Sequence, residues 1–165
     1  MPAHARCSTP SHALRRLLTL RAHSRHAQAQ FLLDTSRNPD DLEELLWAFV
    51  SDARRPGSSA AAARGRLPTF RGRERRAPLR AAWEAARTGA PEALEQALAG
   101  AEDGSGAQFY CLLYTGLLAE ADGDAVRARE YISRAARSPY AARSGDYMGA
   151  LAINHAQLRG FDAGA

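Results

Sequence analysis

The amino-acid sequence predicts an all-α fold, and three stretches carry this prediction. Residues 108–139 read as two antiparallel helices joined by a tight turn, residues 39–54 as one amphipathic helix, and residues 79–98 as a weaker helix pair. At 165 residues the chain is long enough for one domain. Much of its apolar content is alanine, so we expect a thin core and modest stability.

Residues 1–33 are basic and contain no acidic residue. They also hold several serines and threonines, and one short stretch combines apolar and basic residues at helical spacing: Leu14, Leu17, Leu18 and Arg21. This composition is typical of an organellar transit peptide, and a disordered basic tail is the alternative. The first interpretation places the protein in a plastid or mitochondrion, whereas the second leaves it cytoplasmic.

Residues 39–54 form the clearest isolated helix of the sequence. Asn38 can cap its N-terminus, and Pro39 suits its first turn. Five apolar residues make one stripe along it: Leu42, Leu45, Leu46, Phe49 and Val50. This stripe either packs on the rest of the chain or binds a groove of another protein, and we favour packing within the chain.

Residues 55–77 show no sustained periodicity and are rich in Gly, Pro, Ser and Arg. This composition predicts a flexible linker. Arginines with an embedded aromatic residue, Phe70, also allow a second interpretation, in which residues 54–80 grip RNA phosphates. A single aromatic residue is a weak stacking platform, so the linker is favoured.

Helical spacing returns at Leu79 and continues through Ala82, Trp83 and Ala86. We expect this helix to end near Gly89 and a second one to begin at Pro91. Trp83 is the largest residue of the pair, so we expect it to anchor the core there. Residues 78–160 are therefore predicted to form one helical domain.

The central hairpin has two unlike arms. The first, residues 109–121, is apolar or small at almost every position, so it must be covered on several sides. The second, residues 124–137, has one apolar face and one solvated face. Gly123 supplies a left-handed end for the first helix, and Asp124 can cap the second.

These residues resemble a tetratricopeptide repeat (TPR), a helix hairpin of about 34 residues. The resemblance spans residues 109–139 and rests on five signature positions. Gly116 is the small residue of the first helix, Gly123 is the turn glycine, and the second helix has the small–large–small series of Ala128, Ile132 and Ala135. Leu112, Ala119 and Pro139 depart from the pattern of the family. The resemblance implies antiparallel hairpins stacked in a short right-handed array.

A last helix is expected to run to Arg159, capped by Ser144 or Asp146. We expect four of its residues to face inward: Tyr147, Leu151, Asn154 and Leu158. Two hairpins and this helix come close to the three units that a repeat array generally needs.

The resemblance to the TPR family implies a non-enzymatic scaffold that binds a protein or peptide on the face of its first helices. By position, this partner-binding face consists of Tyr110, Leu113, Leu117 and Glu120. No basic residue lies between Gln108 and Ala121, which disfavours capture of a partner's terminal carboxylate. The identity of the partner and the oligomeric state stay open.

The sequence offers no set of residues for catalysis, a cofactor or a metal. No nucleophile with its base, no phosphate-binding Gly-rich loop and no carboxylate pair suited to acid–base chemistry can be assembled. The two cysteines, Cys7 and Cys111, are too few for a disulfide framework. No apolar run approaches the roughly 18 residues that a membrane-spanning helix needs.

Overall fold

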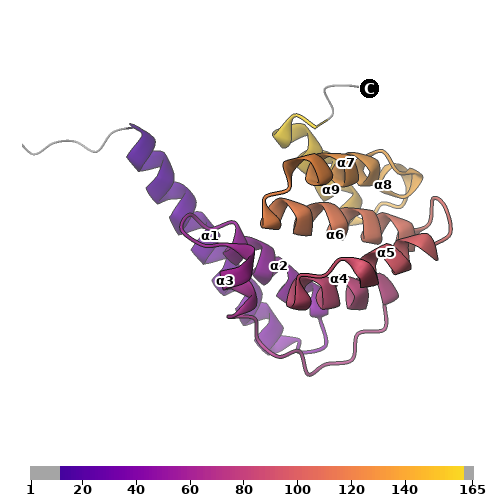
Figure 1. Ribbon diagram of the computed structural model, residues 1–165, viewed down its shortest axis with the longest axis horizontal. Coiled ribbons are helices and arrows are strands. Elements are labelled where there is room, and N and C mark those ends of the chain that lie inside the picture. The colour runs from indigo at the N-terminus through magenta and orange to yellow at the C-terminus, as the bar shows by residue number, and fades with distance from the viewer. Residues whose placement is uncertain (1–11, 162–165) are drawn as a thin grey trace, which may run out of the picture.

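The computed structural model describes residues 12–161, and the side chains of residues 25–161. The described part is helical with no strand, which confirms the all-α prediction, and its helices pack against one another (Figure 1). Residues 1–11 and the side chains of residues 12–24 lie outside the described part. The residues on which the transit-peptide prediction rests are mostly among them.

The described part begins with the 26-residue helix α1 (His12–Arg37), which lies against the 12-residue helix α2 (Leu42–Ala53). Residues 25–33 belong to α1, so this part of the expected tail is helical, and Leu32 packs against the core. Asp41, not Asn38, is the N-cap of α2, because its carboxylate accepts the Glu43 amide. The turn between the helices occupies the residues that we expected to start α2.

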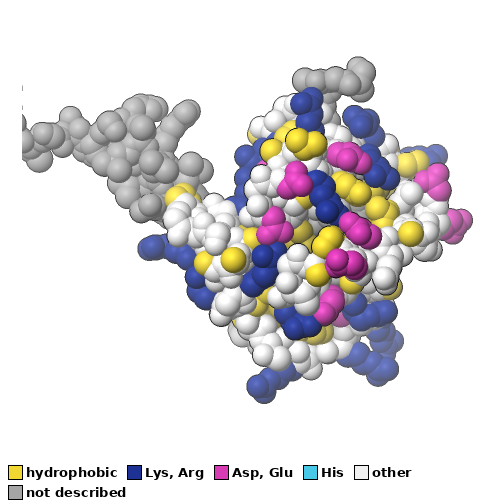
Figure 2. Space-filling view, viewed as in Figure 1, with side chains coloured by type: hydrophobic (Ala, Val, Ile, Leu, Met, Phe, Trp, Pro, Cys, Tyr) yellow, Lys and Arg dark blue, Asp and Glu magenta, His cyan; other side chains and the backbone are white. Residues whose placement is uncertain are grey.

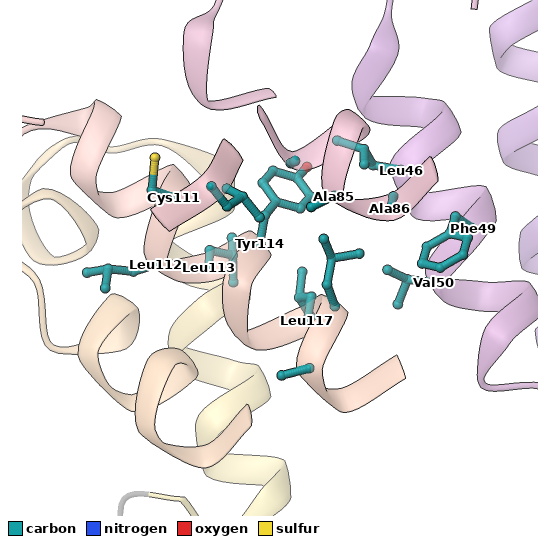
Figure 3. Packing of buried hydrophobic residues seen from close by; sticks show 14 of the residues in the cluster. Leu46, Phe49, Val50, Ala85, Ala86, Cys111, Leu112, Leu113, Tyr114 and Leu117 are labelled. Carbon is teal, nitrogen blue, oxygen red and sulfur yellow. The ribbon is translucent and has the colours of Figure 1, made fainter. Parts of the chain in front are cut away.

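The apolar stripe of α2 is buried within the chain. Its members have at most 6% of their surface exposed: Leu42, Leu45, Leu46, Phe49 and Val50. The stripe packs against α4 (Ala77–Thr88) and α6 (Gly106–Asp122), as Figure 3 shows for residues from all three helices. Each residue of this size gains roughly 1.5–3 kcal/mol from such burial, so α2 is part of the core.

The segment of residues 55–77 contains more structure than its composition indicates. A short helix, α3 (Ala60–Arg64), is capped by Ser59 and buries Ala60 and Ala63. The side chain of Phe70 packs edge-on against Trp83, with 6.3 Å between the ring centroids. We expected a linker, and the structure instead attaches this segment to α2 and α4. Local periodicity missed α3 because its helical residues are only alanines and an arginine.

Two helix pairs follow, α4 with α5 (Glu92–Ala99) and α6 with α7 (Ala125–Ala136). The first helix of each pair ends at a glycine in the left-handed region, Gly89 with a φ of 80° and Gly123 with a φ of 86°. Trp83 is only partly buried, so it is not the core anchor that we expected. The core of α4 is made by smaller residues: Leu79, Ala82, Ala85 and Ala86.

Close packing between α6 and α7 depends on the small residue at Gly116. A Cβ atom at this position would lie 2.5 Å from Ile132 Cγ1 and 2.9 Å from the Ile132 amide nitrogen. Ala128, Ile132 and Ala135 have no exposed surface. Gly116 therefore lies where α6 and α7 approach closely, and Gly123 ends α6 in the left-handed region.

The last two helices of the described part are α8 (Pro139–Arg143) and α9 (Tyr147–Arg159). Asp146 is the N-cap of α9. The inward face of α9 differs from our expectation, because Tyr147 is 75% and Leu158 87% exposed. The buried residues are small or flexible: Met148, Gly149, Ala152 and Ala156. A Cβ at Gly149 would lie 2.9 Å from the Ala141 carbonyl oxygen. Close contact with α8 therefore requires that the small residues of α9 face inward.

One buried polar group of α6 has no hydrogen-bond partner within the protein. Thr115 is 5% exposed, and its Oγ1 contacts no donor or acceptor. Helical threonines commonly bond to the carbonyl four residues earlier. Thr35 does so with Phe31 at 2.9 Å, and Thr88 does so with Glu84 at 2.7 Å.

We therefore expect Thr115→Val to leave the free energy of unfolding unchanged or to raise it by up to about 1 kcal/mol. The matched control, Thr35→Val, removes a made hydrogen bond and should lower it by up to about 1 kcal/mol. Urea denaturation measures both variants. A loss above about 1 kcal/mol for Thr115→Val would mean that the hydroxyl is already satisfied in the native state.

Candidate functional site

The four residues expected to form a partner-binding face do not share one exposed surface. Leu113 and Leu117 have no exposed surface at all, which corrects their assignment. The physical reason is that α2, α4, α5 and α7 all pack against α6 and together cover the apolar arm. Tyr110 and Glu120 are partly exposed, and each belongs to a different polar cluster.

Glu120 is the centre of an ion cluster. Its carboxylate pairs with Arg54, with His155 Nε2 at 2.8 Å and with Arg159 Nε at 2.8 Å. Burial alone would raise the pKa of Glu120, but the His155 hydrogen bond and the Arg54 charge outweigh it and lower the pKa. The cluster connects α9 and the end of α2 to α6, so Glu120 stabilises the packing of these helices.

Tyr110 belongs to a second cluster, which joins α6 to the start of α9. Its hydroxyl donates to Asp146 Oδ2 at 2.9 Å, and the Tyr140 hydroxyl donates to the same oxygen at 2.7 Å. The other oxygen of Asp146 accepts the Met148 amide at 2.9 Å. Asp146 therefore caps α9 and orders two tyrosines.

A third tyrosine extends this cluster toward α2. The Tyr114 hydroxyl donates to Glu43 Oε1 at 2.7 Å, and Arg76 NH1 donates to Glu43 Oε2 at 3.0 Å. The rings of Tyr110 and Tyr114 stack with centroids 6.4 Å apart. Tyr114 itself is fully buried and links the cluster to the core. We call the other five residues, which are at least partly exposed, the tyrosine–carboxylate face: Glu43, Arg76, Tyr110, Tyr140 and Asp146.

The electrostatics of this face keep its tyrosines protonated. Burial, and then the hydrogen bond to Asp146, raise the pKa of Tyr110, to which the Glu43 charge also contributes. The hydrogen bond to Asp146 raises the pKa of Tyr140, with smaller contributions from burial and from Glu43. The charge of Glu43 raises the pKa of both Tyr110 and Tyr140, so Glu43 and Asp146 act electrostatically on the same two tyrosines.

The two carboxylates are shifted in opposite directions. Burial raises the pKa of Glu43 more than its bonds to Tyr114 and Arg76 lower it. Burial would also raise the pKa of Asp146, but the bonds from Tyr140, Met148 and Tyr110 lower it. Each hydroxyl has donated its hydrogen, and Arg76 compensates the charge of Glu43. The face therefore offers acceptor oxygens and the negative charge of Asp146 to whatever binds there.

Sequence reasoning missed most of this face. Tyr110 was the one member among the expected site residues, and Asp146 was considered only as a cap. The spacing of Tyr110 and Tyr114 by one helical turn was the available signal, because it places two tyrosines on the same side of α6. No local pattern connects them with Glu43 or Arg76.

The arginines of residues 54–80 mostly bind the protein's own carboxylates. Five of them form ion pairs with acids of the chain: Arg54, Arg55, Arg64, Arg66 and Arg76. Arg64, for example, reaches Asp122 at 2.8 Å and donates to the Ala86 carbonyl at 3.0 Å. On the face seen in Figure 2, side chains of both charges alternate with hydrophobic ones.

Comparison of the chain with protein-family models, with curated proteins and with solved structures finds no match. Among the described residues, no group of three or more His, Cys, Asp or Glu side chains is arranged to hold a metal. The helices of residues 12–161 are all too short or too polar to cross a membrane. The fold and the site together define an all-helical protein with an aromatic, carboxylate-bearing surface.

Proposed function

We propose that this chain is a non-enzymatic scaffold of TPR-like type that binds a segment of another protein. Two successive helix pairs, each with a left-handed glycine after its first helix, support this proposal. The tight contact of Gly116 with Ile132 is a further similarity to the packing of such repeats. In this proposal the pairs stack in a short right-handed array, with α2 and α9 covering its ends.

The binding surface of the proposed scaffold is the tyrosine–carboxylate face. The single observation that carries it is the convergence of Tyr110 and Tyr140 on Asp146 beside Glu43. Tyrosine rings present large contact areas at a small entropic cost, which makes them frequent at protein interfaces. Since the face offers acceptors and negative charge, its partner is a segment with basic or N–H-rich side chains.

A photo-crosslinking residue at position 147 tests this proposal. Tyr147 is 75% exposed and follows Asp146, so it borders the face without belonging to its hydrogen bonds. Val126 is a matched control, because it is 81% exposed and lies on α7. We expect capture of a defined protein from native extract at position 147 and not at position 126.

Asp146→Asn supplies the second arm of this experiment. Asparagine caps helices about as well as aspartate, so α9 keeps its N-cap while the face loses one charge. We expect the captured protein to decrease several-fold in this variant. Equal capture at both positions, or capture that Asp146→Asn leaves unchanged, would contradict the proposed binding surface.

RNA binding through residues 54–80 has weaker support than protein binding. Among the described residues, five arginines of residues 54–80 form ion pairs within the chain, and the side chains of four others do not: Arg71, Arg73, Arg75 and Arg80. Phe70 is partly buried and packs against Trp83, and one half-buried ring is a weak platform for stacking bases. Crosslinks that disappear after ribonuclease treatment would favour the RNA alternative.

A further inference from the structure

A pocket of about 270 Å³ lies between the end of α1 and the segment of residues 68–71, which follows α3. Figure 1 shows the chain after α3 passing beside the end of α1. The walls are mainly apolar, and Leu32, Pro39, Pro68 and Phe70 contribute to them. All four keep exposed surface, so a ligand can reach them. No residue that lines the pocket belongs to the tyrosine–carboxylate face, so the pocket is independent of the proposed function.

The wall formed by residues 68–71 is held in place on both sides. Phe70 packs edge-on against Trp83 of α4, with 6.3 Å between the ring centroids. Directly after the wall, a Cβ at Gly72 would lie 2.7 Å from Asp40 Cα, and the Arg73 amide donates to Asp40 Oδ1 at 2.9 Å. A ligand therefore finds this wall already formed and does not have to order it on binding.

Arg71 is the one charged residue among the described residues that line the pocket. Its side chain is exposed and makes no ion pair within the described part of the chain. The carboxylate of Asp40, which accepts the Arg73 amide, does not line the pocket. The pocket therefore combines apolar walls with one positive charge that has no acidic partner.

The hydroxyl groups of the pocket limit which anion it suits. Thr35 and Ser36 donate their hydrogens to carbonyl oxygens of α1, at 2.9 Å and 2.6 Å. Among the described side chains of the lining, Arg71 and the exposed Thr69 are left to donate to an anion. A carboxylate suits this set, because it carries one charge and binds a guanidinium through two parallel hydrogen bonds. A phosphate monoester carries nearly two charges, so one guanidinium would compensate it only in part.

We propose that this pocket binds a small free aliphatic monocarboxylic acid of about six carbons. The tail contacts the apolar walls, and the carboxylate pairs with Arg71. The size is suitable, because a cavity of about 150 Å³ holds a benzene molecule and this pocket of about 270 Å³ has room for a flexible chain. A peptide end would offer the same carboxylate, but its backbone amides need partners that the apolar walls do not provide.

A matched series of six-carbon compounds tests the proposal on the full chain. Hexanoate, hexan-1-ol and hexylamine share a tail and differ in charge. Titration followed by NMR should show saturable shifts at Leu32, Thr69 and Phe70 for hexanoate, with binding at least about five-fold tighter than for the alcohol or the amine. This preference should shrink as the salt concentration rises from about 0.05 M to about 0.5 M, because Arg71 is exposed. Equal binding of the three compounds, or no saturable shifts with hexanoate, would overturn the proposal.

The length of the tail tests the apolar walls separately from the charge. Butyrate keeps the carboxylate and is two methylene groups shorter, so it should bind about ten-fold more weakly than hexanoate. If butyrate bound as tightly as hexanoate, the guanidinium would attract the anion without help from the walls, and the pocket would not be the binding site.

Two arginine variants test the role of the charge. Arg71→Gln removes it, so hexanoate should bind about five-fold more weakly and close to the affinity of hexan-1-ol for the wild type. Arg75→Gln is the matched control, because Arg75 is also exposed in this loop and does not line the pocket. It should leave the affinity for hexanoate within about two-fold of the wild type. Undiminished binding to Arg71→Gln, or an equal loss in both variants, would contradict the assignment.

A tripeptide with a free carboxyl end tests the source of the carboxylate. Gly-Gly-Leu carries an aliphatic side chain beside its terminal carboxylate, and we expect it to bind more weakly than hexanoate. Tighter binding of the peptide would indicate the end of another protein as the occupant and would overturn the assignment to a free acid.

Discussion

Replacing Gly116 by alanine is expected to lower the free energy of unfolding by at least about 2 kcal/mol. The added Cβ would lie 2.5 Å from Ile132 Cγ1 and 2.9 Å from the Ile132 amide nitrogen. A side chain can rotate away, but the nitrogen belongs to the backbone of α7, so the two helices must separate. Helix propensity opposes this effect, since alanine is about 1 kcal/mol better than glycine within a helix. We expect the steric cost to exceed this gain. Chemical denaturation of the wild type and of Gly116→Ala measures the difference in the free energy of unfolding.

Gly100→Ala is the matched control for this prediction. The nearest atom to a Cβ at Gly100 is the Gln96 carbonyl oxygen at 3.6 Å, so this change should alter stability by no more than about 0.5 kcal/mol. The double variant Gly116→Ala with Ile132→Ala should lose less than the sum of the single losses, because Ile132→Ala removes the nearest clashing atom. Wild-type stability of Gly116→Ala would show that α6 and α7 are not in close contact.

The spacing of residues along the sequence was enough to predict which residues are buried in some of the helices. The stripe of α2 and the small residues of the α6–α7 contact follow helical spacing, and both are buried in the structure. For α9 the pattern failed, because contact with α8 requires the small residue Gly149 and turns Tyr147 and Leu158 to solvent. The larger apolar residues of a helix mark its buried face only where the neighbouring helix leaves room for them.

The candidate site was less predictable than the fold, because its bonds join distant parts of the chain. Tyr110 and Asp146 are 36 residues apart, and Tyr114 and Glu43 are 71 residues apart. The burial of Leu113 and Leu117 was equally hard to predict, because it depends on how several helices, α2 among them, pack around α6. A family resemblance confined to residues 109–139 describes one hairpin and carries no information about a helix that precedes it.

The second large effect is expected at Asp52, the most buried carboxylate of the described residues. It is 2% exposed and accepts hydrogen bonds from Arg55 at 2.9 Å and from Arg66 Nε at 2.8 Å. Asp52→Ala leaves both guanidinium groups without this partner, which typically costs about 3–5 kcal/mol when the pair is fully buried. Since Arg55 and Arg66 keep 23% and 46% of their side-chain surface exposed, we expect a loss of about 2–4 kcal/mol.

An exposed ion pair provides the control for Asp52→Ala. Glu130 and Arg134 pair on the surface of α7, with side chains 57% and 45% exposed. Glu130→Ala should therefore change the free energy of unfolding by less than about 0.5 kcal/mol. An equally small effect of Asp52→Ala would mean that the segment of residues 55–77 is not attached to α2 in solution.

The contribution of Asp52 should also depend on pH in a defined direction. Burial alone would raise its pKa, but the hydrogen bonds from Arg66 and Arg55 outweigh burial and lower the pKa below the ordinary value of 3.8. A group whose pKa is lower in the folded state stabilises the fold above its unfolded pKa and loses this effect as the pH falls through the folded value. The difference in unfolding free energy between the wild type and Asp52→Asn should therefore be constant from neutral pH to about 5 and should shrink below 3.8. A difference that stays the same down to the acid transition would contradict the ion pairs of Asp52, because asparagine does not titrate.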